Sequence, residues 1–161
     1  MDSNIRIKFD KIDRSILEIL QSNAKITNAQ LSKDIGLSPA PTLERVKKLE
    51  QSGIIKSYHA KLDPEKIGLG VSTFVLVSLI GHNKGNIDAF MKEINLIPEV
   101  IECHHITGTG DFILKIIAKD INSYNAFTVN VISNIPNIGQ YHSSIVLHEV
   151  KKSTKFKIDL D

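Results

Sequence analysis

Five basic side chains and a single acidic one lie between residues 45 and 61 of this chain. Lysine and arginine neutralise nucleic-acid phosphates, and an arginine can also form two parallel hydrogen bonds to guanine. The whole chain carries a net charge of only +2, so this local excess, and not the total charge, favours nucleic-acid binding. A solvated helix face is the alternative interpretation. The basic residues are Arg45, Lys47, Lys48, Lys56 and Lys61, and the acid is Glu50.

A second group of side chains, Cys103, His104, His105 and His142, has the chemistry of metal ligands. Side chains alternate between the two faces of a strand, so Cys103 and His105 share a face while His104 points away. Three ligands would therefore not converge, and we interpret these residues as sheet or interface side chains without a metal. Cys103 is also the only cysteine, which excludes a disulfide framework and a multi-cysteine zinc module.

No serine or cysteine nucleophile has a recognisable partner pattern, and no glycine-rich phosphate loop follows a strand. We therefore expect neither catalysis nor a bound cofactor. No opening apolar run resembles a signal peptide and no stretch is long enough to span a bilayer, which predicts a cytoplasmic protein with no membrane partner. At 161 residues, of which 42% are hydrophobic, the chain has room for one medium domain or two small ones.

The basic cluster begins on a predicted pair of short helices joined by a tight turn. Thr27 opens the first helix with the pattern of a capping box, and Gly36 ends it. Ser38 is expected to cap the second helix, with Pro39 at its first position, where a missing N–H group costs nothing.

The second helix of this pair has two chemically different faces. Its apolar residues recur at three-residue steps, and its exposed face is polar and mostly basic. A short helix, a glycine turn and a capped helix with an outward arginine form the helix-turn-helix pattern, whose second helix enters the major groove of DNA. An ordinary helical hairpin is the alternative. The predicted buried stripe is Leu43, Val46 and Leu49, and the predicted exposed residues are Pro41, Glu44, Arg45 and Lys48.

A further helix, capped by Asp10, should support this pair and complete a three-helix bundle at residues 10–53. Residues 54–62 are rich in branched and aromatic side chains, which predicts a strand leaving the bundle. The predicted organisation is a loose arm at 1–9, a helix-turn-helix domain at 10–64, a linker at 65–71 and a second domain at 72–161.

Residues 72–161 have the predicted element order βαββαβ. This order predicts a ferredoxin-like α+β sandwich, in which both helices cover one face of an antiparallel four-stranded sheet. The elements are a strand at 72–80, a helix capped by Asn86 and ended by Pro98, strands at 100–107 and 112–118 joined by a turn, a helix between Asp120 and Pro136, and a strand at 140–150.

The face of the sheet without helices is predicted to be apolar as well. In the third strand, apolar residues at 112, 114 and 116 alternate with Ile113 and Ile117, so both faces carry apolar side chains. Exposed apolar patches of this size mark interaction sites. We predict that two copies pack sheet to sheet as a twofold homodimer, which would also pair two recognition helices for a pseudo-palindromic DNA site.

Several segments resemble the Lrp/AsnC transcriptional regulators, and the resemblance covers nearly the whole chain. LSPAPTLERVKKLE, at 37–50, is its most specific part. The resemblance implies an N-terminal winged-type DNA-binding domain, a C-terminal effector-sensing domain, dimers that commonly form a ring of four, and amino acids or related metabolites as effectors. The other matching segments are Asp10-Lys11-Ile12-Asp13, Gly53-Ile54-Ile55 with Tyr58, and 102–108 with Asp111.

The resemblance also implies which residues contact DNA. It places the helix-turn-helix at about residues 28–47, and Arg45 is the strongest candidate because it can bind guanine or a phosphate. A salt bridge from Arg45 to Glu44 or to a neighbouring acid is the alternative. The DNA-side candidates are Ser38, Ala40, Pro41, Thr42, Glu44, Arg45 and Lys48.

The effector pocket that the resemblance implies lies between sensing domains and is built around a glycine-aspartate turn. A carboxylate such as Asp111 can hold an ammonium group, while exposed backbone N–H groups hold a carboxylate. A plain hairpin turn is the alternative. Gly110 stands where the family usually has a bulkier residue, and Ser143 where threonine is usual. The pocket candidates are Ile106, Thr107, Gly108, Thr109, Gly110, Asp111 and Ser143.

Three functional interpretations remain open. We favour a sequence-specific regulator of amino-acid or related metabolism that binds double-stranded DNA, responds to an amino-acid-type effector, and assembles from homodimers into an octamer. An effector-independent DNA-organising protein is the second interpretation. The third is a haem-pathway decarboxylase on the same fold, which would need basic side chains beside histidine, whereas the basic residues here gather at the predicted recognition helix.

Overall fold

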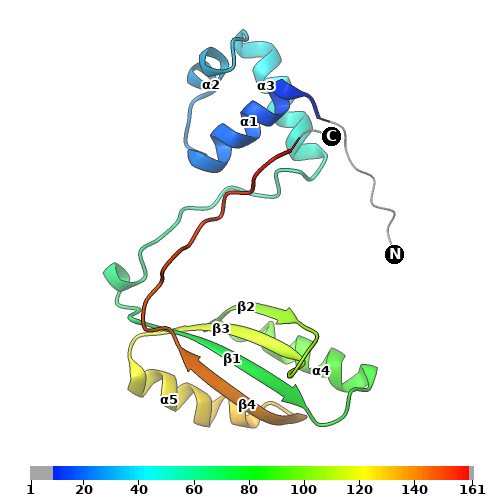
Figure 1. Ribbon diagram of the computed structural model, residues 1–161, viewed down its shortest axis with the longest axis vertical. Coiled ribbons are helices and arrows are strands. Elements are labelled where there is room, and N and C mark those ends of the chain that lie inside the picture. The colour runs from blue at the N-terminus through cyan, green and yellow to red at the C-terminus, as the bar shows by residue number, and fades with distance from the viewer. Residues whose placement is uncertain (1–8, 160–161) are drawn as a thin grey trace. The chain divides into compact units, whose positions relative to one another are not determined.

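A computed structural model describes residues 9–159, and these fold into two compact units. Residues 9–61 and 151–159 form the first, called here the helical unit, and residues 62–150 form the second, the sheet unit. Figure 1 shows the last segment of the chain beside the first helices. The predicted division assigned 72–161 to one domain, whereas the final segment belongs to the helical unit.

The helical unit contains the three predicted helices, α1 (Lys11–Ser22), α2 (Asn28–Asp34) and α3 (Pro39–Gln51). Asp10 caps α1 as predicted, and its carboxylate accepts hydrogen bonds from the backbone of Ile12 and Asp13. The Asp13 side chain accepts the Asp10 N–H in return. This reciprocal box satisfies donors that the first turn of a helix leaves without partners.

Local residues set the start of α2 and the turn between α2 and α3. The hydroxyl of Thr27 accepts the N–H of Gln30 at the start of α2. Gly36 has a φ of +70°, a left-handed conformation that only glycine adopts without strain. Ser38 precedes α3 with an extended backbone but makes no side-chain cap hydrogen bond. Its carbonyl instead accepts both the N–H and the hydroxyl of Thr42.

The core of the helical unit is small. Residues 1–8 of the predicted loose arm lie outside the described part of the chain, but Phe9 packs against this core. Partly buried apolar side chains from α1, from α3 and from the segments that flank the helices extend the cluster, so the unit relies on few deeply buried groups. The buried apolar residues are Ile16, Leu17, Leu31 and Leu49.

The prediction of a strand at 54–62 is wrong, because the structure assigns no strand to these residues. No neighbouring strand pairs with them within the described chain, and an extended sequence alone does not form a ladder. The segment is held to α3 through Tyr58, whose hydroxyl donates to Glu50 at 2.8 Å. Partial burial, together with this hydrogen bond, raises the pKa of Tyr58 to about 12.

The last described residues are fastened to the end of α1. The side chain of Gln21 accepts the N–H of Phe156 at 2.6 Å and donates to its carbonyl at 3.2 Å. Ile158 packs against the core of the helical unit. Residues 135 positions apart in the sequence therefore meet in one unit, which local sequence patterns do not reveal.

The sheet unit has the predicted βαββαβ order. Its strands pair antiparallel in the order β2-β3-β1-β4, the ferredoxin-like arrangement (Figure 1). Asn83, and not Asn86, caps the first helix, and the last strand ends at residue 145 instead of 150. The elements are β1 (Val71–Leu79), α4 (Lys84–Ile94), β2 (Val100–His105), β3 (Phe112–Ala118), α5 (Ile121–Asn130) and β4 (Ile138–Ile145), with short 3-10 turns at Glu65–Ile67 and Ile132–Asn134.

Both helices of this unit pack on the same face of the sheet. Phe90 of α4 and Phe127 of α5 belong to one buried cluster with alternate residues of β1 and β3. The strand residues between them point to the other face, which no element of the described sheet unit covers. Phe74 on that face is 39% exposed, although it lies in the central pair of strands.

Candidate functional site

The buried stripe of α3 agrees with the predicted one at Val46 and Leu49 and differs from it at Leu43. Leu43, predicted to be buried, is 43% exposed, while Thr42 has no exposed surface. Arg45 and Val46 are half-buried and Leu49 is buried, so the inward positions are 42, 45, 46 and 49. This is the spacing of one helical face. Leu43 therefore lies on the outer face of the predicted recognition helix, where sequence analysis did not place it.

Thr42 was predicted to lie on the DNA side, and its burial corrects this prediction. Its hydroxyl donates to the Ser38 carbonyl at 2.9 Å, which satisfies the buried polar group. Thr42 therefore positions the first turn of α3 from inside the unit. Ser38, Ala40, Pro41, Glu44 and Lys48 are exposed.

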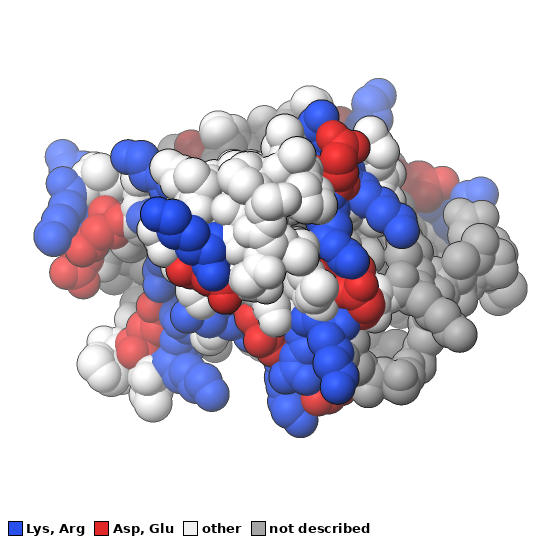
Figure 2. Space-filling model, turned by 90° about the horizontal axis from the view of Figure 1, so that it is seen from above, with Lys and Arg blue, Asp and Glu red and all other residues white. Residues whose placement is uncertain are grey.

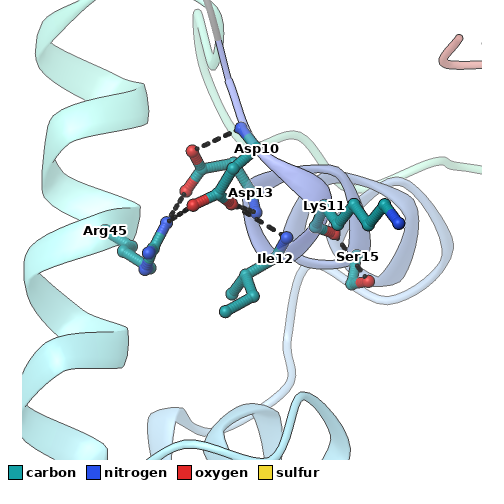
Figure 3. Close-up of polar contacts among 6 residues, drawn as sticks. All are labelled: Asp10, Lys11, Ile12, Asp13, Ser15 and Arg45. Atoms are coloured by element: carbon teal, nitrogen blue, oxygen red, sulfur yellow. Dashed lines mark hydrogen bonds and ion pairs between the residues drawn. The ribbon is translucent and has the colours of Figure 1, made fainter. Parts of the chain in front are cut away.

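Arg45 is bound to the beginning of α1. Its Nη1 atom lies 2.7 Å from Oδ1 of Asp13 and 2.8 Å from Oδ2 of Asp10, as Figure 3 shows. The hydrogen bonds that Arg45 donates to the Asp13 and Asp10 carboxylates raise the pKa of Arg45. Acids 32 and 35 residues earlier thus orient the side chain, which remains 31% exposed. Arg45 thus forms a salt bridge, but with distant acids at the start of α1 and not with Glu44, whose carboxylate lies 3.2 Å from Lys47.

An open cleft lies along this contact on the surface of the helical unit. Acidic groups of α1 and basic groups of α3 line it together, so its charge is mixed. On the face drawn in Figure 2, blue and red side chains likewise alternate around an area of uncharged ones. The lining residues are Phe9, Asp10, Asp13, Pro41, Glu44, Arg45 and Lys48.

The predicted effector turn closes the hairpin between β2 and β3. The N–H of Ile106 donates to the Asp111 carbonyl at 2.9 Å, and the N–H of Asp111 donates to the Val77 carbonyl at 2.8 Å. A Cβ atom on Gly110 would lie 2.7 Å from two carbons of Leu76. This turn approaches β1 so closely that any larger residue at position 110 would require the Leu76 side chain to move.

The Asp111 carboxylate has two partners near the end of β1. Its Oδ2 atom accepts the N–H of Leu79 at 2.8 Å, and its Oδ1 atom lies 3.0 Å from Nδ1 of His82. The side chain of Asp111 is 18% exposed and that of His82 is 72% exposed. Sequence analysis missed His82, because it lies 29 positions before Asp111 and belongs to no motif.

Ser143 is not joined to this turn. It pairs with Val75 in the register of β4 against β1, and its hydroxyl accepts a hydrogen bond from Tyr124 of α5. Asp111 contacts β1 further along the strand, at Val77 and Leu79. Within one chain the structure therefore brings together residues 106–111 but leaves Ser143 bound to a helix.

The histidines of β2 follow the predicted alternation. Cys103 and His105 pair with Leu114 and Phe112, which are buried, whereas His104 pairs with Ile113. Burial raises the pKa of the Cys103 thiol, which disfavours the reactive thiolate. The described residues contain no group of three or more metal-ligating side chains, and none of their helices is long and apolar enough to cross a membrane.

Comparison with protein families assigns both halves of the chain. Residues 9–56 match the winged helix-turn-helix DNA-binding domain, and residues 72–156 match the Lrp/AsnC ligand binding domain. The second match alone spans more than half of the 161 residues.

Similar proteins are transcriptional regulators. The chain is 40% identical to the transcriptional regulator AzlB of Bacillus subtilis, covering 95% of this chain and 98% of that protein. It is 36% identical to the leucine-responsive regulatory protein of Escherichia coli, covering 92% and 91%. A Neisseria meningitidis transcriptional regulator, solved as an L-Met complex, matches with a TM-score of 0.89 and 35% identity, over 93% of this chain and 97% of that one. With a DNA-binding domain, a ligand-binding domain and relatives that match nearly end to end, the chain belongs to the Lrp/AsnC family of transcriptional regulators.

Proposed function

We propose that this regulator binds double-stranded DNA sequence-specifically by inserting the exposed face of α3 into the major groove. The observation that carries the proposal is the helix pair α2 and α3 joined at Gly36, which leaves most polar residues of α3 exposed. Helix pairs of this kind place the second helix in the groove. Ser38, Ala40, Pro41, Glu44 and Lys48 supply the surface, and Leu43 adds an apolar group suited to a thymine methyl.

Arg45 contributes to the same surface in a fixed orientation. Both described ion pairs use its Nη1 atom, and a guanidinium carries five N–H donors. Asp10 and Asp13 would hold one corner of the group while its other donors bind a phosphate or a guanine. If Arg45 reads a base, Arg45→Ala should cost about 1–3 kcal/mol at one position of the site.

Selection of the full-length protein against a random pool of duplexes tests the DNA half of the proposal. We expect one enriched sequence with two related halves. Lys48→Ala should then weaken binding to all duplexes alike. It should also reduce the slope of log affinity against log salt concentration by about one. Lys66→Ala removes an exposed lysine of the sheet unit and serves as the control. No enriched sequence, or equal effects of the two variants, would contradict the proposal.

The effector of this regulator is an amino acid or a related small metabolite. The proposal rests on the ligand-binding domain and on the turn at 106–111, where a carboxylate lies beside glycines. The relative that was solved with L-Met supports this class of ligand. The Asp111 carboxylate already binds Leu79 and His82, which favours the second candidate, a DNA-organising protein that needs no effector.

Thermal unfolding against the twenty amino acids separates the two candidates. A ligand at a hundredfold excess over its dissociation constant adds about 2.7 kcal/mol of stability. We expect a clear shift for one class of amino acid, and its loss in Asp111→Ala. If no amino acid shifts the unfolding or the DNA affinity, the effector proposal fails and the effector-independent candidate is favoured.

The regulator acts as a homodimer that assembles further into an octamer in the cytoplasm. The sheet face without helices supports the dimer, since Phe74, Leu76, Ile113 and Ile117 lie on it without full burial. Lys115 covers part of this face, with its Nζ atom 5.7 Å from the Phe74 ring centre and 3.3 Å from Glu102. Two such faces, packed together, would pair two recognition helices about one DNA turn apart.

Sedimentation of the wild type and of Phe74→Glu tests this assembly. A charge in the centre of an apolar interface is costly to desolvate, so we expect the variant to sediment as a monomer and to lose DNA affinity. Val129→Glu introduces the same charge at an exposed apolar position of α5 and is the control. A monomeric wild type, or an unchanged Phe74→Glu assembly, would contradict the proposed dimer.

A further inference from the structure

The loop between β1 and α4 places His82 against the carboxylate proposed to bind the effector. The backbone of this loop is fixed on both sides of Gly81. The N–H of Ile80 donates to the Asn137 carbonyl at 2.7 Å, and the side chain of Asn86 donates to the Ile80 carbonyl at 2.8 Å. Asn83 then caps α4 through the N–H of Asn86 at 2.9 Å. His82 is therefore presented from a held backbone while its side chain stays 72% exposed.

The Asp111 carboxylate retains capacity for a ligand. Two carboxylate oxygens offer about four lone-pair positions, and the described contacts to Leu79 and His82 use two of them. An ammonium group can therefore bind Asp111 without displacing either partner. The partly exposed side chain keeps one edge of the carboxylate accessible.

The imidazole of His82 extends the polar surface from that carboxylate. Because Nδ1 faces Asp111, Nε2 lies across the ring from it. Contact of Nε2 with an anion requires the imidazolium form, which donates from both nitrogens. The Asp111 carboxylate can thus accept a hydrogen bond from a cation, while Nε2 of the His82 imidazolium can donate one to an anion. An α-amino acid carries an ammonium group and a carboxylate on one carbon, so its two charged groups can contact Asp111 and His82 together.

We infer that His82 is a specificity residue of the effector site, which binds the α-carboxylate of an amino acid whose ammonium group lies on Asp111. This inference rests on the proposed effector function and assigns one residue beyond it. The exposed backbone of Gly108 and Thr109 would share the carboxylate. His82 would add a side-chain N–H donor to these backbone donors. The site would accordingly prefer free amino acids over ligands without a carboxylate.

Calorimetric titration of the full-length protein with L-amino acids and their C-terminal amides tests this inference. The probes are L-methionine, L-leucine, L-methioninamide and L-leucinamide, followed by any other amino acid that shifts thermal unfolding. In the wild type the free acid should bind at least tenfold more tightly than its amide. His82→Ala should weaken binding of the acid roughly tenfold to a hundredfold, as for one hydrogen bond to a charged group, and leave the amide within twofold.

Two further variants separate recognition from stability. His82→Gln retains a neutral N–H donor and should restore part of the preference for the acid. His148→Ala removes another exposed histidine of the sheet unit and should bind like the wild type. Thermal unfolding without ligand shows whether each variant is folded.

Each outcome bears on a different claim. If His82→Ala binds the acid within twofold of the wild type, the inference is wrong while the effector function stands. Equal losses for acid and amide would show that His82 only supports the loop, which also overturns it. If the wild type binds no amino acid and no amide, the effector function itself fails, and the inference falls with it.

Discussion

The helical unit and the sheet unit hold their functional side chains by different means. Among the described residues, the central cluster of the helical unit buries four apolar side chains, and that of the sheet unit buries thirteen. The helical unit adds polar ties between distant segments, such as Arg45 to Asp13 and Gln21 to Phe156. The sheet unit rests on apolar contacts between strands and helices.

This difference indicates where each unit is vulnerable. Burial of apolar surface is the largest favourable contribution to folding, so a small core leaves a unit dependent on hydrogen bonds and ion pairs. Those contacts contribute less individually and respond to pH and salt. We expect the sheet unit to lose most stability when apolar volume is removed, and the helical unit when a polar tie is broken.

Leu114→Ala should have the largest effect on stability. Leu114 has no exposed surface and lies in the central pair of strands, so its truncation leaves a cavity that costs about 2–5 kcal/mol. Hydrogen exchange resolved by peptide should show the loss in the sheet unit, with α1 to α3 unchanged. Leu96→Ala, at a leucine that is 72% exposed, is the control. Equal effects of the two variants would contradict the assignment of the core.

Gln21→Ala should weaken the helical unit by about 1–2 kcal/mol, because it removes both hydrogen bonds to the Phe156 backbone. The exchange of amides near Phe156 and at the end of α1 should accelerate, while the sheet unit should not respond. Gln51→Ala, at an exposed glutamine that ends α3, is the matched control. If Gln21→Ala leaves these amides protected, the final segment is held by Ile158 and not by this tie.

Thr73→Val should stabilise the sheet unit by about 1 kcal/mol. Thr73 has no exposed surface, and in the described structure its hydroxyl has no hydrogen-bond partner, so an apolar group of the same shape removes an uncompensated desolvation cost. Chemical denaturation would measure the gain. Thr128→Val is the opposite case, because the Thr128 hydroxyl donates to the Asn125 carbonyl at 2.8 Å. Stabilisation by both variants, or by neither, would contradict this account.

The smallest expected effect is a loss of stability of the helical unit at acidic pH. The Asp13 backbone N–H, and then Arg45, hold the pKa of Asp10 below its ordinary value of 3.8 despite some desolvation. A carboxyl group whose pKa is lower in the folded state than in the unfolded state stabilises the folded state at pH values above the unfolded pKa. That contribution disappears as the pH falls from about 3.8 through the lower folded value. The helical unit should therefore lose stability in that window.

Asp10→Asn removes this pH dependence while keeping a residue that caps helices well. Unfolding followed by circular dichroism, from neutral pH into acid, should show a shallower decline for the variant than for the wild type. Asp34→Asn, at an exposed acid of α2, is the control. An identical decline in the wild type and in Asp10→Asn would show that the Asp10 contact adds no measurable stability.

Much of the fold followed from signals that lie within a few residues of one another. Asp10, Thr27 and Asp120 begin helices as predicted, and Gly36 makes the turn before α3. The alternation of apolar residues predicted the strands of the sheet unit and their βαββαβ order. Capping and periodicity act over one or two turns of chain, so the sequence contains them directly.

The direction in which α3 faces depended on packing. Three-residue spacing predicted Leu43, Val46 and Leu49 as the buried stripe; Val46 and Leu49 do lie inward, but Thr42 is buried in place of Leu43. Successive residues of a helix are about 100° apart around its axis. With Thr42 facing inward, Leu43 therefore faces outward. Local periodicity does not distinguish two neighbouring stripes when a short polar residue such as threonine can be buried with its hydroxyl bonded.

The sequence by itself therefore determined the helices, the turn, the order of strands and the family. Tertiary structure alone decided that Asp13 holds Arg45, that Gln21 fastens Phe156, and that His82 faces Asp111. These pairs lie 32, 135 and 29 positions apart in the chain. Contacts of that kind depend on how whole elements pack, and no spacing rule within a segment encodes them. The side chains that orient both candidate sites were for this reason visible only after the chain was folded.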